Sequence, residues 1–349
     1  MALGIDIGKY SIKMIQLSMN ADKIKVEQIG ILNTFDDLNK FNLDNLSKSQ
    51  LSACIQDLAS QMNIKQKKIK NVVTSLSGKS IDIRQITTLD MPDEELIASL
   101  ELEAKKHIPL DGTDAIIDYH HLGKNNSELD KIDVVLVTTT KSKITDHSKI
   151  VKSSGFKPGI FDADPIALSN LYEHCNNLPD DGADVILNIG HTSTTLIVWG
   201  KNSSYFTREI NIAGHQINQR IMQDLNIDYK AADQEKNDKG INVFDLNNDS
   251  NNTENNISIE KRTVFNDLIE EIRKTLRFYM KSNNQSFFNT FYISGGCANI
   301  PGLKEFITSN LNVKIEELDI FKNIENSFDI KNPEQYSLAI GLAIRGLKE

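Results

Sequence analysis

The sequence is short of cysteine, of basic residues and of long apolar runs, and each shortage excludes a class of protein. Its three cysteines are widely spaced and form no Cys-x-x-Cys pair, which argues against a disulfide framework and favours a reducing compartment. The formal net charge of −9 leaves no basic excess for a nucleic-acid backbone, so we expect no nucleic-acid partner. No window reaches the roughly 18 apolar residues of a membrane span, and the N-terminus MALGIDIG lacks the basic region of a signal peptide. We therefore expect a cytoplasmic protein that meets a membrane only indirectly, through partners.

The first part of the 349 residues alternates short apolar strands with helices. The predicted elements are strands at Leu3–Ile7, Lys13–Leu17, Lys23–Ile31 and Asn71–Leu76 and a helix at Asn45–Met62. From about residue 81 to residue 161 the pattern continues as β-α-β-β-α-β, and its first helix opens with Pro92 and acidic residues, which are N-terminal signals. This order predicts a compact α+β insert.

The second half starts a new series of strands and helices near residue 184. The predicted strands are Asp184–Ile189, Thr194–Trp199, Ser204–Ile210 and Phe287–Ser294, and the predicted helices are Gly214–Leu225, Ile259–Ser282 and Tyr336–Leu347. Between the first two of these helices, residues 233–256 are rich in Asn and Asp. Such composition predicts a flexible excursion without a packed core.

An internal repeat relates the two halves. LGIDIGKYSIKMIQL (3–17) and VILNIGHTSTTLIVW (185–199) share a buried strand, an x-Ile-Gly turn, a polar patch and a second strand. Asp6 aligns with Asn188, and a third strand follows each pair. Self-similarity of this kind predicts two related lobes whose glycine turns face each other across a cleft.

The turn residues have the chemistry of a phosphate site. Gly8 and Gly190 let a phosphate approach the backbone, whose amides can donate to its oxygens. Asp6 is suited to Mg²⁺, largely through water, and Lys13 to the phosphates as a point charge. A single Asp-x-Gly hairpin is usually only a turn, and the pairing of two such hairpins is what favours a site.

A third glycine turn, in YISGGCANIPGL (292–303), places two glycines at the end of a strand, and three such turns in this order resemble the actin/Hsp70/sugar-kinase ATPase superfamily. Within it, the chain is similar to the family of type IV pilus assembly proteins PilM, relatives of the cell-division protein FtsA. The matching segments are LGIDIGKYSIK (3–13), LELEAKKHIPLDGTDAIIDYHHLG (100–123), FDADPIALSNLY (161–172), NIGHTSTTLIVWGKNSSYFTREINIAGHQI (188–217), EEIRKTLRFY (270–279), YISGGCANIPGL (292–303) and AIGLAIRG (339–346).

The resemblance implies a bilobed actin-like ATPase fold of the α/β class, with ATP and Mg²⁺ in the central cleft and an FtsA/PilM-type insert. It implies a first lobe at 1–80, the insert at 81–161, a second lobe at 162–349 with a C-terminal helix that returns to the first lobe, and interlobe connections at Asp164 and at 339–346. The residues expected to hold the nucleotide are Asp6, Gly8, Lys9, Tyr10, Ser11, Lys13, Asn188, Gly190, His191, Thr192, Gly214, Glu270, Lys274, Gly295, Gly296 and Asn299, with Asp6 and Asn188 on the metal side.

Two positions depart from the family pattern. Asn188 stands where the second phosphate loop normally carries an aspartate, so an oxygen remains but its charge is lost, and we expect slow hydrolysis or none. Lys9 and Tyr10 stand where small residues are usual in the first loop, so Lys9 either adds a phosphate contact or crowds the site.

For function, the resemblance implies an adaptor at the inner face of the inner membrane. It would bind the N-terminal tail of the membrane protein PilN, in a groove between the first subdomain and the insert, and link the pilus platform to its motor ATPases. Homo-oligomer formation stays open. The alternatives are an FtsA-like filament protein of cell division, whose C-terminal amphipathic helix we do not find, and a small-molecule kinase, which needs an acidic general base.

Overall fold

A computed structural model describes residues 1–21, 23–78, 81–106, 115–125, 128–247 and 262–349. The N-terminal strands build a six-stranded sheet in the order β14-β3-β2-β1-β4-β8. Its strands are β1 (Ala2–Ile7), β2 (Ser11–Asn20), β3 (Lys23–Asn33), β4 (Asn71–Leu76), β8 (Ile160–Ala163) and β14 (Ile324–Glu325). Within it, β1 pairs antiparallel with β2 and parallel with β4.

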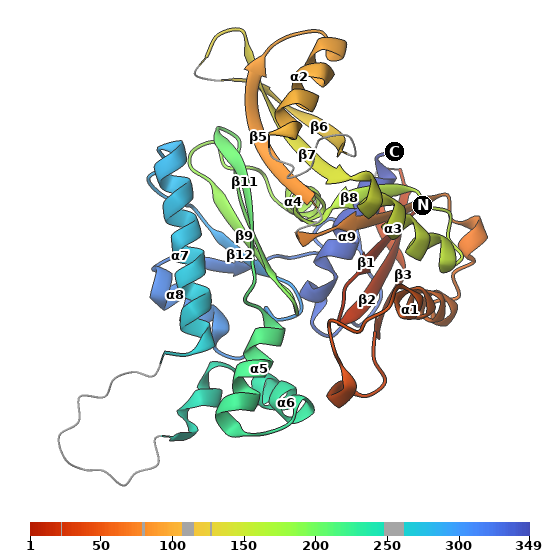
Figure 1. Cartoon of the computed structure of the whole chain (residues 1–349), viewed down its shortest axis with the longest axis vertical. Coiled ribbons are helices and arrows are strands. Elements are labelled where there is room, and N and C mark those ends of the chain that lie inside the picture. The colour runs from red at the N-terminus through yellow and green to blue at the C-terminus, as the bar shows by residue number, and fades with distance from the viewer. Residues whose placement is uncertain (22, 79–80, 107–114, 126–127, 248–261) are drawn as a thin grey trace, which may run out of the picture.

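A second sheet has the same plan, in the order β11-β10-β9-β12-β13. Its strands are β9 (Asp184–Ile189), β10 (Thr194–Gly200), β11 (Ser203–Ile210), β12 (Phe291–Ser294) and β13 (Ile315–Glu317). As β1 does in the first sheet, β9 pairs antiparallel with the next strand and parallel with a later one, β12. The two lobes that the repeat predicts are therefore present, one on each side of the molecule in Figure 1.

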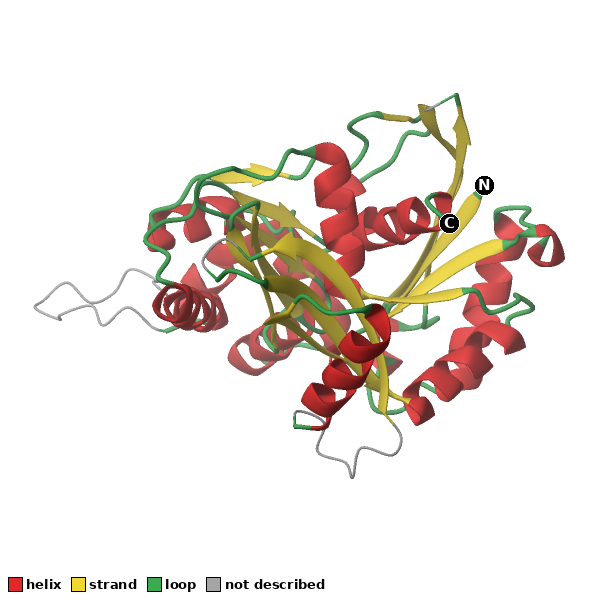
Figure 2. Ribbon diagram, turned by 90° about the horizontal axis from the view of Figure 1, so that it is seen from above, coloured by secondary structure: helices red, strands yellow, loops and turns green. Residues whose placement is uncertain are grey.

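Two helices, α4 (Asp164–Cys175) and α9 (Ser337–Leu347), lie between the sheets. They share one hydrophobic cluster with inward side chains of both sheets, such as Ile15 and Ile186. A Cβ on Gly341 would stand 1.9 Å from the carbonyl oxygen of Ala167, so α9 crosses α4 at a distance that only glycine allows. At the far end of α9, Gly346 lies against Ala2, and both chain ends are on one side of the molecule (Figures 1 and 2).

The outer face of each sheet is covered by helices, as alternation along the strands dictates. Leu3 and Ile5 face α1 (Lys48–Gln61) and α3 (Lys141–Ser153), and Val185 and Leu187 belong to the cluster that includes α7 (Val264–Asn283) and α8 (Leu303–Leu311). The helix expected from residue 45 begins later, because Ser47 caps it in a capping box with Gln50.

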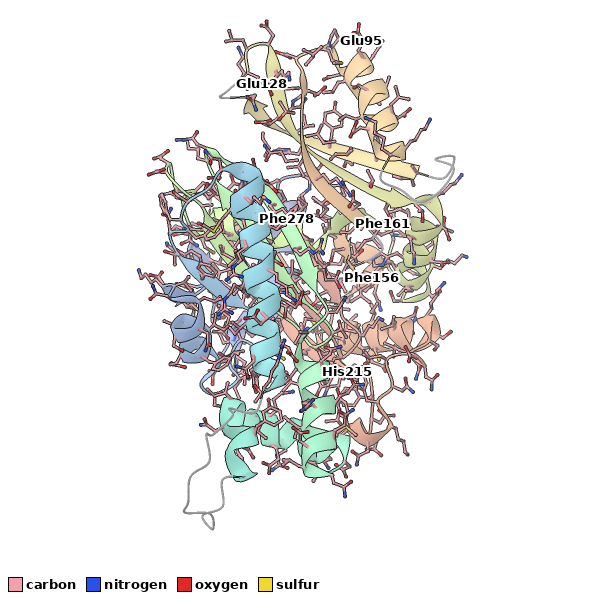
Figure 3. All side chains as sticks on the ribbon, turned by 60° about the vertical axis from the view of Figure 1, so that its left-hand side comes forward. Glu95, Glu128, Phe156, Phe161, His215 and Phe278 are labelled. Carbon is pink, nitrogen blue, oxygen red and sulfur yellow. The ribbon has the colours of Figure 1, made fainter. Side chains whose placement is uncertain are left out.

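The insert has a three-stranded sheet in the order β5-β7-β6 and a core of its own. It consists of β5 (Ile81–Leu89), α2 (Asp93–Lys105), β6 (Ala115–Lys124) and β7 (Lys131–Thr140). The order β-α-β-β-α-β expected for 81–161 is found, but β8 pairs with β4 in the first sheet and α3 packs on α1. We therefore propose that the inserted unit ends near residue 140. Figure 3 shows it projecting from the lobes, with Glu95 and Glu128 at its far end.

The tract expected to be flexible is largely helical. Its residues 233–247 belong to α6 (Tyr229–Lys239) and the 3-10 helix η4 (Gly240–Asn247), and residues 248–256 lie outside the described residues. The prediction is wrong for residues 233–247 because Asp228 caps α6, accepting from the amide of Ala231, and because Ala232 and Val243 enter the core. The remaining helices are α5 (Gly214–Leu225), η1 (Leu38–Lys40), η2 (Gln66–Lys68) and η5 (Pro333–Tyr336).

Membrane-spanning helices were sought as well. Within the described part of the chain, no helix is both long and apolar enough to cross a bilayer.

Candidate functional site

A cleft of about 290 Å³ lies between the lobes. The turn β1–β2 lines it from the first lobe, and the turn β9–β10, the glycine pair after β12 and one side of α6 line it from the second. The predicted site residues that line it are Asp6, Gly8, Lys9, Tyr10, Ser11, Lys13, Asn188, Gly190, His191, Thr192, Gly295 and Gly296. The structure thus brings three separate glycine segments to one place.

The two hairpin turns have the same local geometry. A Cβ on Gly8 would lie 2.6 Å from the carbonyl oxygen of Ser11, and one on Gly190 would lie 2.9 Å from that of Ser193. Both turns therefore require glycine at this point. In the strand register Asp6 stands opposite Lys13, and Asn188 opposite Thr195, so Asp6 and Asn188 occupy equivalent positions.

The first turn is charged and rigidly held. Lys13 Nζ lies 3.1 Å from Asp6 Oδ2, and only 15% and 12% of these two side chains are exposed. Thr34, at the end of β3, donates from its hydroxyl to the carbonyl of Lys9 at 2.6 Å and from its amide to that of Tyr10 at 3.0 Å. These two hydrogen bonds hold the backbone of the turn in place.

Asp164 is a cleft residue to which the sequence analysis gave no ligand role. It opens α4 and lines the cleft with Asp6. Burial, together with the carboxylates of Asp6 and Glu209, raises the pKa of Asp164 to about 8, against the opposing effect of a hydrogen bond with Ser75. A carboxyl beside other carboxylates marks a region of negative potential. A cation bound there would be stabilised.

A second group of cleft residues comes from α6, within the tract that was expected to be flexible. Lys236 is almost fully buried, and its Nζ donates to Asp233 Oδ1 at 2.6 Å and to Asn218 Oδ1 at 2.9 Å. Asn218 also donates to Asp233, at 2.8 Å. The cap at Asp228 and the Asp233–Lys236 spacing of i,i+3 are helix signals that could have revealed this segment.

The second turn carries an imidazole. The ring of His191 lies 3.9 Å from that of Tyr10, centroid to centroid, and its Nε2 is 3.0 Å from the hydroxyl of Tyr229. Burial, followed by the positive charge of Lys236, lowers the pKa of His191 to about 2. The imidazole is therefore neutral at physiological pH and does not act as a cationic phosphate ligand.

Four predicted site residues do not line the cleft. Gly214 lies behind the second turn, its amide donating to the carbonyl of Gly190 at 3.2 Å, and Asn299 donates to Glu334 at 2.8 Å. Glu270 pairs with Arg273, and Lys274 pairs with Glu271 at 2.8 Å. Glu270 and Lys274 lie on α7, whose apolar stripe packs on the outer face of the second sheet, and their role toward the nucleotide stays a prediction.

The cleft can hold a cation only with help from its ligand. Among the described residues, no three His, Cys, Asp or Glu side chains are arranged to hold a metal ion. Mg²⁺ usually retains several waters and takes one or two carboxylates together with substrate phosphates. The carboxylates of Asp6 and Asp164 in one cleft fit that manner of binding.

Comparison with known proteins agrees with this architecture. A family model described as "Type IV pilus assembly protein PilM" matches residues 4–347. The "PilM-PilN type IV pilus biogenesis complex" matches 100% of this chain and 99% of that chain, with a TM-score of 0.82 and 22% identity. The ethanolamine utilization protein EutJ from Carboxydothermus hydrogenoformans gives a TM-score of 0.52 at 11% identity, covering 98% and 89% of the two chains. MreB 5 of Spiroplasma citri bound to AMPPNP gives 0.52 at 10% identity, covering 97% and 93%. The fold is thus the bilobed actin-like ATPase fold that the sequence predicts.

Proposed function

Since this chain belongs to the family of type IV pilus assembly proteins PilM, we propose that it is an ATP-binding adaptor of the inner-membrane platform that builds the pilus. The observation that carries the nucleotide part is the pair of glycine turns, alike in geometry, that line one cleft from opposite lobes. A structure of the same fold, MreB 5, is described as bound to AMPPNP.

The cleft residues divide into groups with different roles toward ATP. The amides around Gly8 and Gly190 would donate to phosphate oxygens, and Lys9, Ser11 and Thr192 would add side-chain donors. Gly296 leaves room for the flat adenosine, since a Cβ there would find its nearest neighbour 3.9 Å away. Gly295 has another role: its φ of +93° and the carbonyl oxygen of Ile189, 2.5 Å from where a Cβ would stand, require glycine in the turn itself. Asp233 and Lys236 add a carboxylate and an ammonium to the lining of the cleft.

A magnesium ion would lie between Asp6 and the phosphates. Asp6, Asp164 and the amide oxygen of Asn188 would hold its water ligands, and the ion would neutralise phosphate charge. Asn188 supplies no charge at the position equivalent to Asp6. This asymmetry supports slow hydrolysis or none, and therefore a role in which bound nucleotide sets the shape of the protein.

We propose further that this chain binds the N-terminal tail of a PilN protein, as the description of a structure of similar fold, a PilM–PilN complex, suggests. A suitable group lies where the insert meets the first lobe. Asp162 on β8 has a buried Oδ2 that no donor among the described residues reaches. Asp118 on β6 and Arg345 on α9 are near enough to shift its pKa, which burial raises to about 6. A peptide amide or ammonium would satisfy this oxygen.

Binding to PilN would hold the protein at the inner face of the inner membrane. In that position it would link the platform to the motor ATPases of the pilus, alone or as a homo-oligomer. These finer parts of the function follow from the family resemblance and from no contact in the structure.

Calorimetric titration with a synthetic peptide of the PilN N-terminus tests the partner. We expect saturable binding, weakened about tenfold in Asp162→Asn, since a hydrogen bond to a charged group is worth roughly 1.5–3 kcal/mol. Asp130→Asn, in an exposed turn of the insert, is the matched control. If the peptide does not bind folded wild-type protein, the PilN proposal is wrong; if Asp162→Asn binds as tightly as the control, only the docking position is wrong.

A further inference from the structure

A segment of the first lobe crosses to the second lobe beside the cleft. We call residues 34–46, which run from the end of β3 toward α1, the strap. Asn39 in the strap donates from its side-chain amide to Asp228 Oδ2 at 3.2 Å, and its Oδ1 accepts from the backbone amide of Lys230 at 2.9 Å. Asn39 therefore supplies an acceptor for one of the free amides at the start of α6. Figure 1 shows the strap next to α5 and α6 at the bottom of the molecule.

Aromatic rings from both lobes pack together above this contact. From the first lobe, Tyr10 lies 4.9 Å from Phe35 and 5.4 Å from Phe41. From the second lobe, the ring of His191 lies 3.9 Å from that of Tyr10 with an interplanar angle of 33°, which is a close, tilted face-to-face contact. Phe41 also approaches Tyr229, at 5.9 Å. The strap and the first turn thus form one aromatic surface that rests on the second lobe.

The second-lobe side of this cluster is held by a hydroxyl. The oxygen of Tyr229 lies 3.0 Å from His191 Nε2 and 2.8 Å from His215 Nδ1, so it can donate to one imidazole and accept from the other. Figure 3 shows His215 on α5, on the side of the molecule where the strap lies. His191 consequently has a fixed ring for Tyr10 to stack on.

We propose that the contact between the Tyr10 and His191 rings is a latch that holds the two lobes together and has to open when nucleotide enters. Tyr10 and His191 are close neighbours in sequence of Gly8 and Gly190, and both line the cleft. A polyphosphate that reaches the amides of both turns has to pass between residues that are now in ring contact. The proposal rests on the proposed nucleotide site. It adds that the latch and the strap limit how fast nucleotide enters and leaves the cleft.

The latch gives the large ring of Tyr10 a role in joining the two turns. A small side chain at position 10 would leave the turns separated by solvent, whereas Tyr10 joins them. The contact does not depend on protonation, since burial keeps the imidazole of His191 neutral.

The test uses Tyr10→Ser in the full-length protein, with Tyr119→Ser in the insert as the matched control. Hydrogen exchange of the nucleotide-free proteins is measured for peptides covering the strap and residues 228–232. Fluorescence stopped flow then measures association of N-methylanthraniloyl-ATP. We expect exchange at the Lys230 amide and nucleotide association to rise about tenfold in Tyr10→Ser, because aromatic stacking contributes roughly a factor of ten per pair, and we expect neither to change in Tyr119→Ser.

The two measurements separate the latch from the nucleotide site. If exchange in the strap is the same in Tyr10→Ser and wild type, the latch does not exist. If exchange rises and N-methylanthraniloyl-ATP binds neither protein, the proposed nucleotide function fails while the interlobe contact stands. If exchange rises and association is equally fast in both proteins, the latch closes the lobes but does not limit nucleotide entry, and that part of the proposal is overturned. Asn39→Ala, which removes the strap's contact but leaves the rings, should raise exchange without removing the stack.

Discussion

Asp6 and Lys13 stand opposite each other in the first hairpin and are joined by an ion pair of 3.1 Å. The equivalent pair in the second hairpin, Asn188 and Thr195, is uncharged. The two turns therefore share a backbone geometry but differ in charge. At this pair of positions, the charged side chains are Asp6 and Lys13, both in the first hairpin. Any metal dependence of nucleotide binding should accordingly depend on Asp6 more than on Asn188.

Replacing Asp6 by asparagine should remove the magnesium dependence of ATP binding. We expect affinity in the presence of Mg²⁺ to fall at least about tenfold, since a hydrogen bond or ion contact to a charged group contributes roughly 1.5–3 kcal/mol. Calorimetry with and without Mg²⁺ measures the effect, with Asp130→Asn as control. An Asp6→Asn protein that still binds Mg²⁺–ATP more tightly than free ATP, by the wild-type ratio, would contradict this role.

Replacing Gly341 by alanine should weaken the contact between the two interlobe helices. The new Cβ would meet the backbone oxygen of Ala167 at 1.9 Å, and neither helix can yield without moving a lobe. We expect a loss of about 1–3 kcal/mol in the free energy of unfolding, typical of overpacked cores, measured by urea denaturation. Gly296→Ala is the control, because its Cβ would meet only Gln335, at 3.9 Å. Equal stability of the two variants would show that α4 and α9 are not so closely packed.

The raised pKa of Asp164 makes stability depend on pH. Its pKa is about 8 in the folded protein and 3.8 as the ordinary value, so between these values the folded state retains a proton that the unfolded state has lost. The free energy of unfolding should therefore fall as pH rises from about 4 to 8. In Asp164→Asn this decrease should be smaller, and urea denaturation at several pH values measures it.

Other groups with shifted pKa values, among them Asp162, His147 and His191, act in or near this window and are present in both proteins. Burial raises the pKa of Asp162 to about 6 and lowers that of His147 to about 4, and these shifts act on stability in opposite directions. Taking the difference between wild type and Asp164→Asn isolates Asp164. Parallel pH profiles for the two proteins would show that Asp164 is already ionised at neutral pH.

Lys236 should matter for stability and for nucleotide affinity together. Lys236→Met leaves the carboxylate of Asp233 without its cation in a nearly buried site, where breaking an ion pair costs about 3–5 kcal/mol. Lys239→Met, on the same helix but with 39% of its lysine side chain exposed, is the control and should change stability by less than about 0.5 kcal/mol. Thermal unfolding measures the stability of the two variants. If the two variants lose equal stability, the buried triangle of Lys236, Asp233 and Asn218 does not hold α6 in place.

The parts of the fold that depend on local patterns were predictable from sequence. The hairpins around Gly8 and Gly190 follow from alternating apolar strands and a turn that needs glycine, and α5 has the bounds that were expected, Gly214–Leu225. The repeat that relates Asp6 to Asn188 predicted the two lobes as well. In each case residues close in sequence determine the result.

The parts that depend on distant contacts were not predictable. Whether β8 joins the insert or the first sheet is decided by its pairing with β4, and nothing within Ile160–Ala163 indicates that partner. The Asn-rich composition of the tract did not predict α6. The stability of this helix comes from the cap at Asp228 and from burial of Ala232. Lys236 was therefore missed. Glu270 and Lys274 were placed by family resemblance, and the packing of α7 decides which of its faces is exposed.

Calorimetric titration of the purified protein with ATP and Mg²⁺ tests the central claim most directly. The account predicts saturable binding of one nucleotide per chain, weakened when Mg²⁺ is removed and weakened, in the presence of Mg²⁺, by Asp6→Asn. If the folded wild-type protein shows no binding at millimolar ATP, the cleft between the two glycine turns is not a nucleotide site, and the protein would serve the pilus as a scaffold whose closed lobes need no ligand.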